Sequence, residues 1–249
     1  MNNLNLKVVI VDTDFYAMQS INSYLAWDRR TRVTYMAESL DDLWEYLAQT
    51  AEAELPDVVV LDTENLDAKV LFETIVRLRQ VIPELMVLCL GQVVDEAMVE
   101  AAAEAGAGGF LLKQDVRFQI AWAIVFAYRY DFIITSRVAR ACKDSHHPRI
   151  YGAHTLPEQR RYPELTARLR QAIRLCVIEG MPAHLAADEM AISLHTIRGY
   201  IKEGYRILEA YDETEYSVDM TPQERAFMRF TAFADDQSDQ SENALDDEI

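Results

Sequence analysis

Short apolar runs alternate with longer amphipathic stretches over the first 140 or so residues of the chain. The runs consist mostly of branched aliphatic side chains, which is typical of buried strands in a parallel sheet. The stretches between them repeat apolar residues with a period near 3.6, which predicts helices. The expected strands are Lys7–Val11, Val33–Ala37, Asp57–Leu61, Met86–Leu90 and Gly109–Leu112, and the expected helices are Asp14–Ala26, Leu40–Ala48, Asp67–Gln80, Val94–Ala105 and Phe118–Tyr130. Five such βα repeats predict a doubly wound, flavodoxin-like α/β domain.

The pattern changes after residue 142, where we expect the first domain (1–142) to end. Residues 143–163 mix His, Pro, Gly and Arg without periodicity, which predicts a linker. An all-α second domain is expected at 164–234, with short helices up to residue 210 and a further helix at Thr221–Phe233. This last helix opens with Thr221-Pro222-Gln223-Glu224, which has capping-box spacing. Residues 235–249 are acidic and poor in apolar groups, so we expect a disordered tail.

The net charge of −17 is spread unevenly over the 249 residues. From Tyr211 to the end, twelve acidic residues stand against two arginines, a local charge of −10. Evenly spread acidity would argue against a nucleic-acid partner, but acidity concentrated near one end leaves that partner open. We expect the tail either to solubilise the protein or to compete with nucleic acid for a basic surface.

Several classes of protein find no support in the sequence. Three cysteines without a C-x-x-C pair do not indicate a disulfide framework or a zinc site, and His146, His147 and His154 have no acid cluster at ligand spacing. No apolar run reaches about 18 residues and no basic leader is present, so we expect a cytoplasmic protein without a membrane partner. Without a Ser-His-Asp constellation, a P-loop or a dinucleotide fingerprint, we do not expect an enzyme.

Polar side chains directly follow three of the predicted strands. Asp12 follows the first apolar run, Asp62 the third and Lys113 the fifth. In an open parallel sheet, ligands and chemistry collect beyond the carboxyl ends of the strands. An aspartyl-phosphate site requires a central carboxylate, a second carboxylate that helps to hold a divalent cation, and an ammonium group that neutralises a phosphoryl oxygen. These three residues have that chemistry.

Residues 6–130 resemble the receiver domain of two-component response regulators. The segment Ala101–Lys113 is similar to that family, and Phe110 falls where receivers keep their switch aromatic residue. The resemblance places Asp62 at the phospho-acceptor position. It implies that Asp12 and Asp62 hold Mg²⁺ and that a sensor kinase is a partner.

Two positions depart from the receiver pattern. Thr13 stands where the family has a second acid, and Gly91 stands where it has a Ser or Thr whose hydroxyl follows the phosphoryl group. We therefore expect phosphorylation to be weak or absent, and the receiver to serve in dimerisation or in docking a partner. Two alternatives stay open: Asp14 or Glu64 replaces the missing ligand, or the acceptor carboxylate is only an ion-pair partner of the lysine.

The stretch Glu179–Lys202 has the pattern of a helix-turn-helix. Its first helix carries small residues such as Ala187 toward a core, a tight turn follows, and Ser193 is placed to cap the second helix. The outward positions of that second helix are Arg198, Gly199, Lys202 and Arg206. These charges form either a DNA-binding surface or a solvated helix face.

The same stretch resembles the LuxR-type domain of NarL/FixJ response regulators. The residues that carry the resemblance are Gly180, Pro182, Ala186, Ala187, Met190, Ile192, Ser193, Thr196, Ile197 and Tyr200. The resemblance implies that the second helix enters the major groove of double-stranded DNA, with Arg198, Gly199 and Lys202 toward the bases. Thr196 and Arg206 are expected to approach phosphates. A homodimer that reads two half-sites would raise the modest affinity of each module.

The sequence therefore predicts a transcription regulator of the response-regulator type, made of an atypical receiver and a LuxR-type helix-turn-helix domain with an extra C-terminal helix. The alternative is a protein–protein interaction adaptor, in which both domains keep their shapes and DNA is no longer bound.

Overall fold

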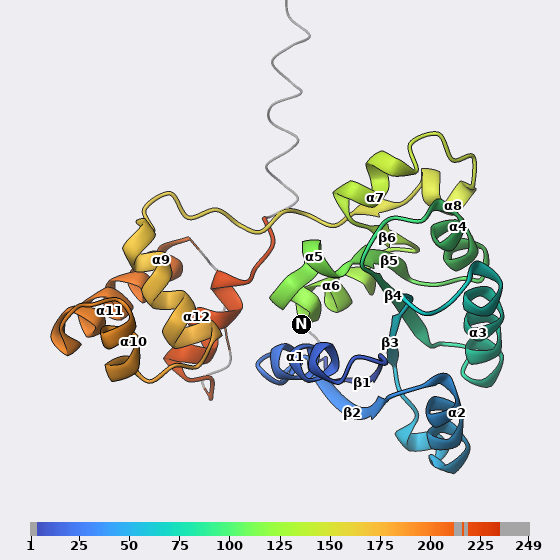
Figure 1. Cartoon of the computed structure of the whole chain (residues 1–249), viewed down its shortest axis with the longest axis horizontal. Helices are drawn as coiled ribbons and strands as arrows, with labels where there is room; N and C mark the ends of the chain where they lie inside the picture. The colour runs from blue at the N-terminus through green and yellow to red at the C-terminus, as the bar shows by residue number, and fades with distance from the viewer. Residues whose placement is uncertain (1–3, 212–215, 217–218, 235–249) are drawn as a thin grey trace, which may run out of the picture. The chain divides into compact units, whose positions relative to one another are not determined.

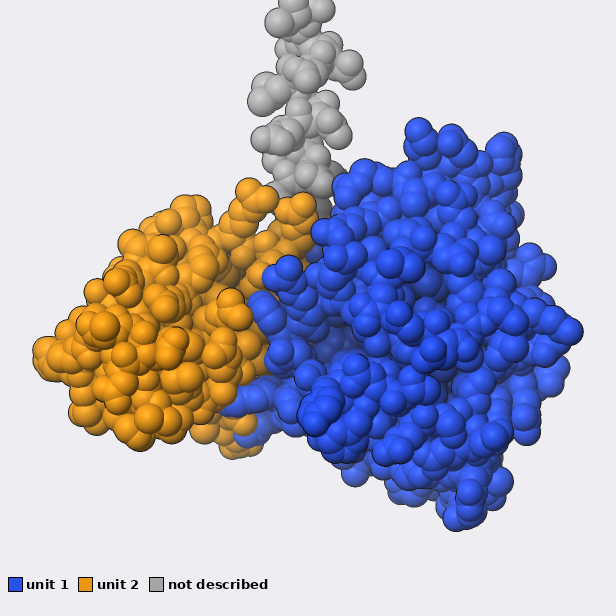
Figure 2. Space-filling view, viewed as in Figure 1, with its two compact units in different colours: residues 1–157 blue, residues 158–249 orange. Residues whose placement is uncertain are grey.

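The structure, a computed structural model, describes residues 4–211, 216 and 219–234. The chain divides into two compact units, Met1–Pro157 and Glu158–Ile249 (Figure 2). Each unit has a hydrophobic core of its own. The predicted acidic tail, 235–249, lies outside the described residues.

A parallel seven-stranded sheet forms the centre of the first unit (Figure 1). Its strands are β1 Leu6–Val11, β2 Thr31–Ala37, β3 Val58–Asp62, β4 Met86–Gly91, β5 Gly109–Leu112, β6 Ile133–Ile134 and β7 His154–Thr155. They lie in the order β2-β1-β3-β4-β5-β6-β7, which confirms the predicted doubly wound α/β fold. The strand order reverses between β1 and β3, and in such sheets the carboxyl ends at the reversal border a crevice.

Helices connect the strands of the first unit. They are α1 Phe15–Ala26, α2 Leu40–Gln49, α3 Ala68–Val81, α4 Glu96–Glu104, α5 Lys113–Val116, α6 Ile120–Ala127, α7 Ser136–Ala141 and α8 Pro148–Tyr151, with 3₁₀ turns η1 Glu52–Glu54 and η2 Arg117–Gln119. A short polar side chain caps each of the first four helices by accepting a backbone N–H of the first turn: Asp14, Ser39, Asp67 and Asp95. These caps fix the loops that follow β1, β2, β3 and β4.

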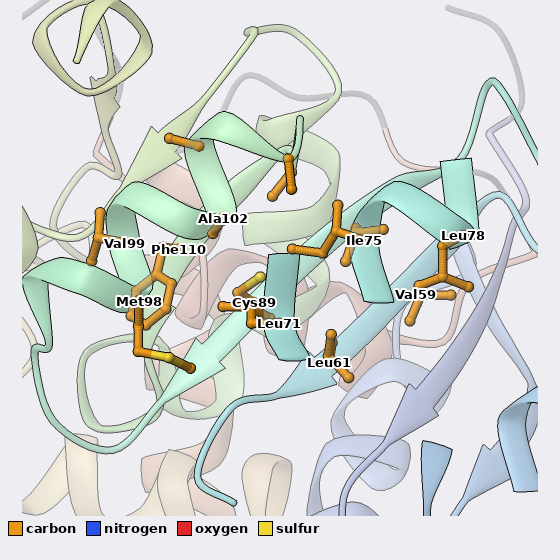
Figure 3. Packing of buried hydrophobic residues seen from close by; sticks show 14 of the residues in the cluster. Val59, Leu61, Leu71, Ile75, Leu78, Cys89, Met98, Val99, Ala102 and Phe110 are labelled. Carbon is orange, nitrogen blue, oxygen red and sulfur yellow. The ribbon is translucent and has the colours of Figure 1, made fainter. Parts of the chain in front are cut away.

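The core of the first unit lies where α3 and α4 cover the central strands. Val59 and Leu61 of β3 are buried, and Leu71, Ile75 and Leu78 recur on one side of α3 in the same cluster (Figure 3). Their spacing of four and three residues places them on one helix face. The continuous apolar run of β3 is therefore explained by burial on both faces of the sheet.

Residues 143–157 belong to the first unit, which corrects the expected boundary at 142 and the linker at 143–163. Arg149 ties this segment to the rest of the unit. Its Nε lies 2.7 Å from Oδ2 of Asp131, and its Nη1 and Nη2 donate to the carbonyl oxygens of Ala103 at 2.7 Å and Ala107 at 2.8 Å. The ring of His154 stacks on the ring of Tyr130. These contacts join residues that are far apart in the sequence, so local periodicity does not predict them.

Five helical segments lie in the described part of the second unit. They are α9 Ala167–Ile173, a π-helical turn η3 Arg174–Ile178, α10 Ala183–Glu189, α11 Leu194–Ala210 and α12 Pro222–Phe230. Ala186 and Ala187 of α10 pack with Met190 and Ile197, as the helix-turn-helix pattern predicted. Ser193 accepts the backbone N–H of Thr196 and so caps α11.

The helix α12 packs on α11 and η3. Its predicted capping box is confirmed: the Thr221 side chain accepts the N–H of Glu224, whose carboxylate accepts the N–H of Thr221. Nε2 of Gln223 donates to the carbonyl oxygen of Cys176 at 2.9 Å, and the Tyr162 hydroxyl donates to that of Arg229. The expected extra helix is thus an integral part of the second unit.

Within the described part of the chain, no helix combines the length and the apolar character needed to cross a bilayer.

We expect Gly204→Ala to destabilise the second unit by about 1–3 kcal/mol, because a Cβ there would lie 2.6 Å from Cδ1 and from Cγ1 of Ile173 in α9. Gly199→Ala is the matched control on the same helix. A Cβ at Gly199 meets nothing within 4 Å, so better helix propensity should stabilise by up to about 1 kcal/mol. Opening free energies of α11 amides from hydrogen exchange would measure both, and equal effects would refute the close packing of α9 on α11.

Candidate functional site

One ammonium group bridges two carboxylates at the carboxyl edge of the sheet. Nζ of Lys113 lies 2.8 Å from Oδ2 of Asp12 and 2.8 Å from Oδ1 of Asp62. Asp12 follows β1, Asp62 ends β3, and Lys113 begins α5 directly after β5. The side chains are 2%, 7% and 18% exposed, respectively. The structure thus brings together the three polar residues that follow the predicted strands.

Burial and charge shift the pKa values of this cluster. Burial raises the pKa of the Asp62 carboxyl above its ordinary value, Lys113 opposes this rise, and the charge of Asp12 adds to it. Burial lowers the pKa of Lys113, but its bonds to Asp12 and Asp62 outweigh burial, and the pKa is raised. The lysine therefore stays protonated at neutral pH, and ionised Asp62 is disfavoured relative to an exposed carboxylate.

Mg²⁺ takes several oxygen ligands in octahedral geometry. The side-chain oxygens around the cluster do not provide such a set. The Thr13 hydroxyl accepts a hydrogen bond from Nδ2 of Asn65 at 2.9 Å, which ties the loop after β1 to the loop after β3. Asp14 caps α1, and Glu64 is exposed, with only its N–H reaching Oδ2 of Asp62 at 3.4 Å. Among the described residues no three acidic, His or Cys side chains are arranged for a metal ion.

The ring of Phe110 is buried against Gly91. Phe110 is 1% exposed and belongs to the same cluster as Met98 and Val99 of α4 (Figure 3). A Cβ at Gly91 would lie 3.1 Å from Cε1 and from Cζ of Phe110 and 3.2 Å from the carbonyl oxygen of Val93. A larger residue at position 91 and the ring in this position therefore compete for the same space. Glycine leaves the inward ring its space, whereas a larger residue at position 91 would require the ring to shift by a few tenths of an ångström.

The predicted DNA-binding residues lie along α11 in the second unit. Thr196 is in the first turn, with its hydroxyl 2.8 Å from that of Ser193. Arg198, Gly199 and Lys202 follow and are exposed. The helix thus carries two cations and a glycine on one accessible side, which is the arrangement that major-groove recognition uses.

Arg206, one turn further along α11, forms an ion pair with Glu203, which was not predicted from the sequence. Its Nη2 lies 2.6 Å from Oε1 of Glu203, and its Nε lies 3.0 Å from Oε2. The spacing of three residues is the signal that would have predicted this pair. By contrast, Arg198 and Lys202 form no ion pair within the described part of the chain.

Comparison with known families identifies the first unit. Residues 8–124 match the family model described as the response regulator receiver domain. They contain most of β1, the strands β2 to β5 and the cluster of Asp12, Asp62 and Lys113. The match covers 117 of the 249 residues and identifies a receiver domain within the first unit.

Several known proteins are similar to the chain over longer stretches. The transcriptional activator protein ExaE of Pseudomonas putida is 29% identical over 157 residues, which are 63% of this chain and 70% of ExaE. The RcsB response regulator of Salmonella typhimurium has a TM-score of 0.48 at 18% identity, covering 88% of this chain and 96% of that one. The receiver domain of NarL from Mycobacterium tuberculosis has a TM-score of 0.43 at 24% identity, covering 51% and 98%.

We expect Asp62→Asn to stabilise the first unit at neutral pH. A carboxyl whose pKa is raised on folding binds a proton more tightly in the native state, so its ionisation destabilises the fold as pH rises through the folded pKa. The amide resembles the protonated form. The gain should therefore shrink as pH falls from about 7 toward about 4, where the wild-type carboxyl becomes protonated in both states.

Urea denaturation across this pH range measures the effect, with Glu64→Gln as the control, because Glu64 is exposed on the same loop. A gain that does not change with pH, or a loss of stability at pH 7, would contradict the burial effect and show that Lys113 fully compensates both carboxylates.

Proposed function

We propose that this protein is a DNA-binding transcription regulator whose receiver works without conventional phosphorylation. The observation that carries the proposal is the exposed cationic side of α11, the second helix of a packed helix-turn-helix. Arg198 and Lys202 on this side form no ion pair with the residues that the structure describes. A guanidinium can fork onto a guanine edge, and an ammonium can reach guanine or phosphate. Gly199 between them allows a close approach of the backbone.

The relatives support this proposal. ExaE, which is 29% identical to this chain over 157 residues, is named a transcriptional activator. Regulators of this kind act by binding, and no step of covalent chemistry is needed for α11 to read DNA. We propose double-stranded DNA and a second copy of the chain as partners, because two half-sites raise affinity and specificity together. A cytoplasmic location is part of the same proposal.

The receiver is proposed to dock a partner or to support dimerisation. Lys113 already neutralises part of the charge of Asp12 and Asp62, and Thr13 supplies no further carboxylate. The Phe110 ring lies inward beside Gly91, so this ring has no outward-to-inward movement left for phosphorylation to drive. Input from a sensor kinase would then have to reach the protein through contact instead of through a phosphoryl group.

Selection of genomic fragments by the purified full-length protein tests DNA binding. We expect enrichment of a sequence with two half-sites whose centres lie about 34–36 Å apart along the duplex. The double substitution Arg198→Ala, Lys202→Ala should abolish enrichment, whereas Lys143→Ala, Arg161→Ala removes the same two charges from exposed positions off α11 and should not. Failure of the wild-type protein to enrich any sequence, at low salt as well, would favour the interaction adaptor.

Acetyl phosphate tests the receiver. With Mg²⁺ present, we expect no stoichiometric labelling of Asp62 in the wild-type chain, because the carboxylates that a cation needs are held by Lys113 or missing. Thr13→Asp adds one carboxylate beside Asp12, so Mg²⁺ should then raise the melting temperature, with about 2.7 kcal/mol of stabilisation at 100 times the dissociation constant.

The matched control is Thr13→Asn, which also removes the hydroxyl that Asn65 contacts but adds no charge. Full labelling of the wild-type protein, or equal stabilisation of both variants by Mg²⁺, would overturn the proposed metal-independent receiver.

A further inference from the structure

A groove of about 870 Å³ runs along the exposed side of α11 and is completed by α12. Its lining includes Arg198, Lys202 and Arg206 from α11 and Arg225 from α12. The two helices pack against each other in the second unit (Figure 1). The groove therefore continues the predicted DNA-binding side of α11 onto a second helix, and Arg225 is a cation that the helix-turn-helix pattern does not include.

The acids that line the groove are already paired. Glu203 holds the guanidinium of Arg206 through two contacts of 2.6 and 3.0 Å, and Glu209 lies 3.4 Å from Nη1 of Arg229. Arg198, Lys202 and Arg225, in contrast, form no ion pair with any described residue. The groove thus presents three uncompensated cations distributed over two helices, a charge pattern that suits a chain of phosphates.

The position of Arg225 is fixed by its surroundings. Its Nη1 donates to the carbonyl oxygen of Met220 at 2.8 Å, and the capping box of Thr221 and Glu224 holds the first turn of α12. Gln223 binds the carbonyl oxygen of Cys176 in η3 and so anchors the same turn to the domain core. A side chain that is half-buried and held in this way loses little further freedom on binding.

We propose that Arg225 binds a backbone phosphate of the same DNA duplex that α11 reads, and that Glu203 limits this interface by holding Arg206. The inference rests on the proposed function. Duplex DNA is the occupant because the cations follow the length of α11 and pass to α12, whereas a single small anion needs only one or two of them. Arg225 carries charge but lies off the reading helix, so it contributes affinity and not base preference.

Fluorescence anisotropy of a labelled mixed-sequence duplex with the full-length protein, from about 50 to about 300 mM salt, tests the inference. We expect Arg225→Gln to weaken binding roughly fivefold at low salt. The slope of log K against log salt should also fall by about 0.9, the value for one lost phosphate contact. Arg225→Lys should restore the slope because it restores the charge.

Glu203→Gln should change DNA affinity and its salt dependence in the opposite direction to Arg225→Gln. It removes an acid from the groove and releases Arg206, so affinity should rise and the slope should steepen by up to about 0.9. Arg161→Gln is the matched control, because Arg161 is 85% exposed in its side chain, pairs with Glu158 and lies outside the groove. It should match the wild-type protein in affinity and slope.

The outcomes separate the inference from the proposed function. If Arg225→Gln binds like the wild-type protein while Arg198→Ala, Lys202→Ala loses binding, α12 takes no part and the inference is overturned while the regulator stands. If Arg225→Gln and Arg161→Gln weaken binding equally, the effect is one of net charge and the inference also fails. If the wild-type protein binds no duplex at the lowest salt, the proposed function fails and the inference fails with it.

Discussion

The ionic bridge from Lys113 to Asp12 and Asp62 joins the carboxyl ends of β1, β3 and β5, where the candidate site of the first unit lies. Three strands that are far apart in sequence deliver these side chains to one edge of the sheet, and 2.8 Å contacts join them there. Removing Lys113, the one cation of this buried cluster, is expected to cost about 3–5 kcal/mol, because two carboxylates then lose their compensation. Under the proposed function the bridge also limits the site, since the ammonium contacts one oxygen of each carboxylate that a further cation would need.

The packing around Phe110 also bears on the proposal that the receiver works without conventional phosphorylation. Glycine at position 91 leaves the space that the ring occupies, so packing alone keeps the ring buried. A switch needs two arrangements of similar free energy, and a well-packed aromatic ring without a competing side chain strongly favours one of them. The Lys113 bridge and the Phe110 ring are separate features, and under the proposed function each helps to hold the receiver in one state. The Thr13–Asn65 hydrogen bond also ties together the loops after β1 and β3.

Much of this structure could be predicted from the sequence, and the misses have physical causes. The strands β1 to β5 follow from long apolar runs, and the cluster follows from the polar residues at their ends. The strands β6 and β7 contain two residues each and carry no periodicity. Tertiary contacts, such as the pairing of β7 with β6 and the hydrogen bonds of Arg149, show that residues 143–157 belong with the sheet. The ion pair between Arg206 and Glu203 was not predicted either, although a spacing of three residues on a helix brings two such side chains together.

Local pairing of charges explains how a chain with a net charge of −17 can offer a surface to DNA. Net charge governs long-range attraction, which salt screens beyond about 8–10 Å, whereas a phosphate in contact responds to the nearest charges. On α11, Glu203 pairs with Arg206 and Glu209 with Arg229, while Arg198 and Lys202 form no ion pair among the described residues. Weak long-range attraction combined with strong local contacts disfavours binding to arbitrary DNA more than binding to a matched site. Acidity elsewhere in the chain would then increase specificity without preventing recognition.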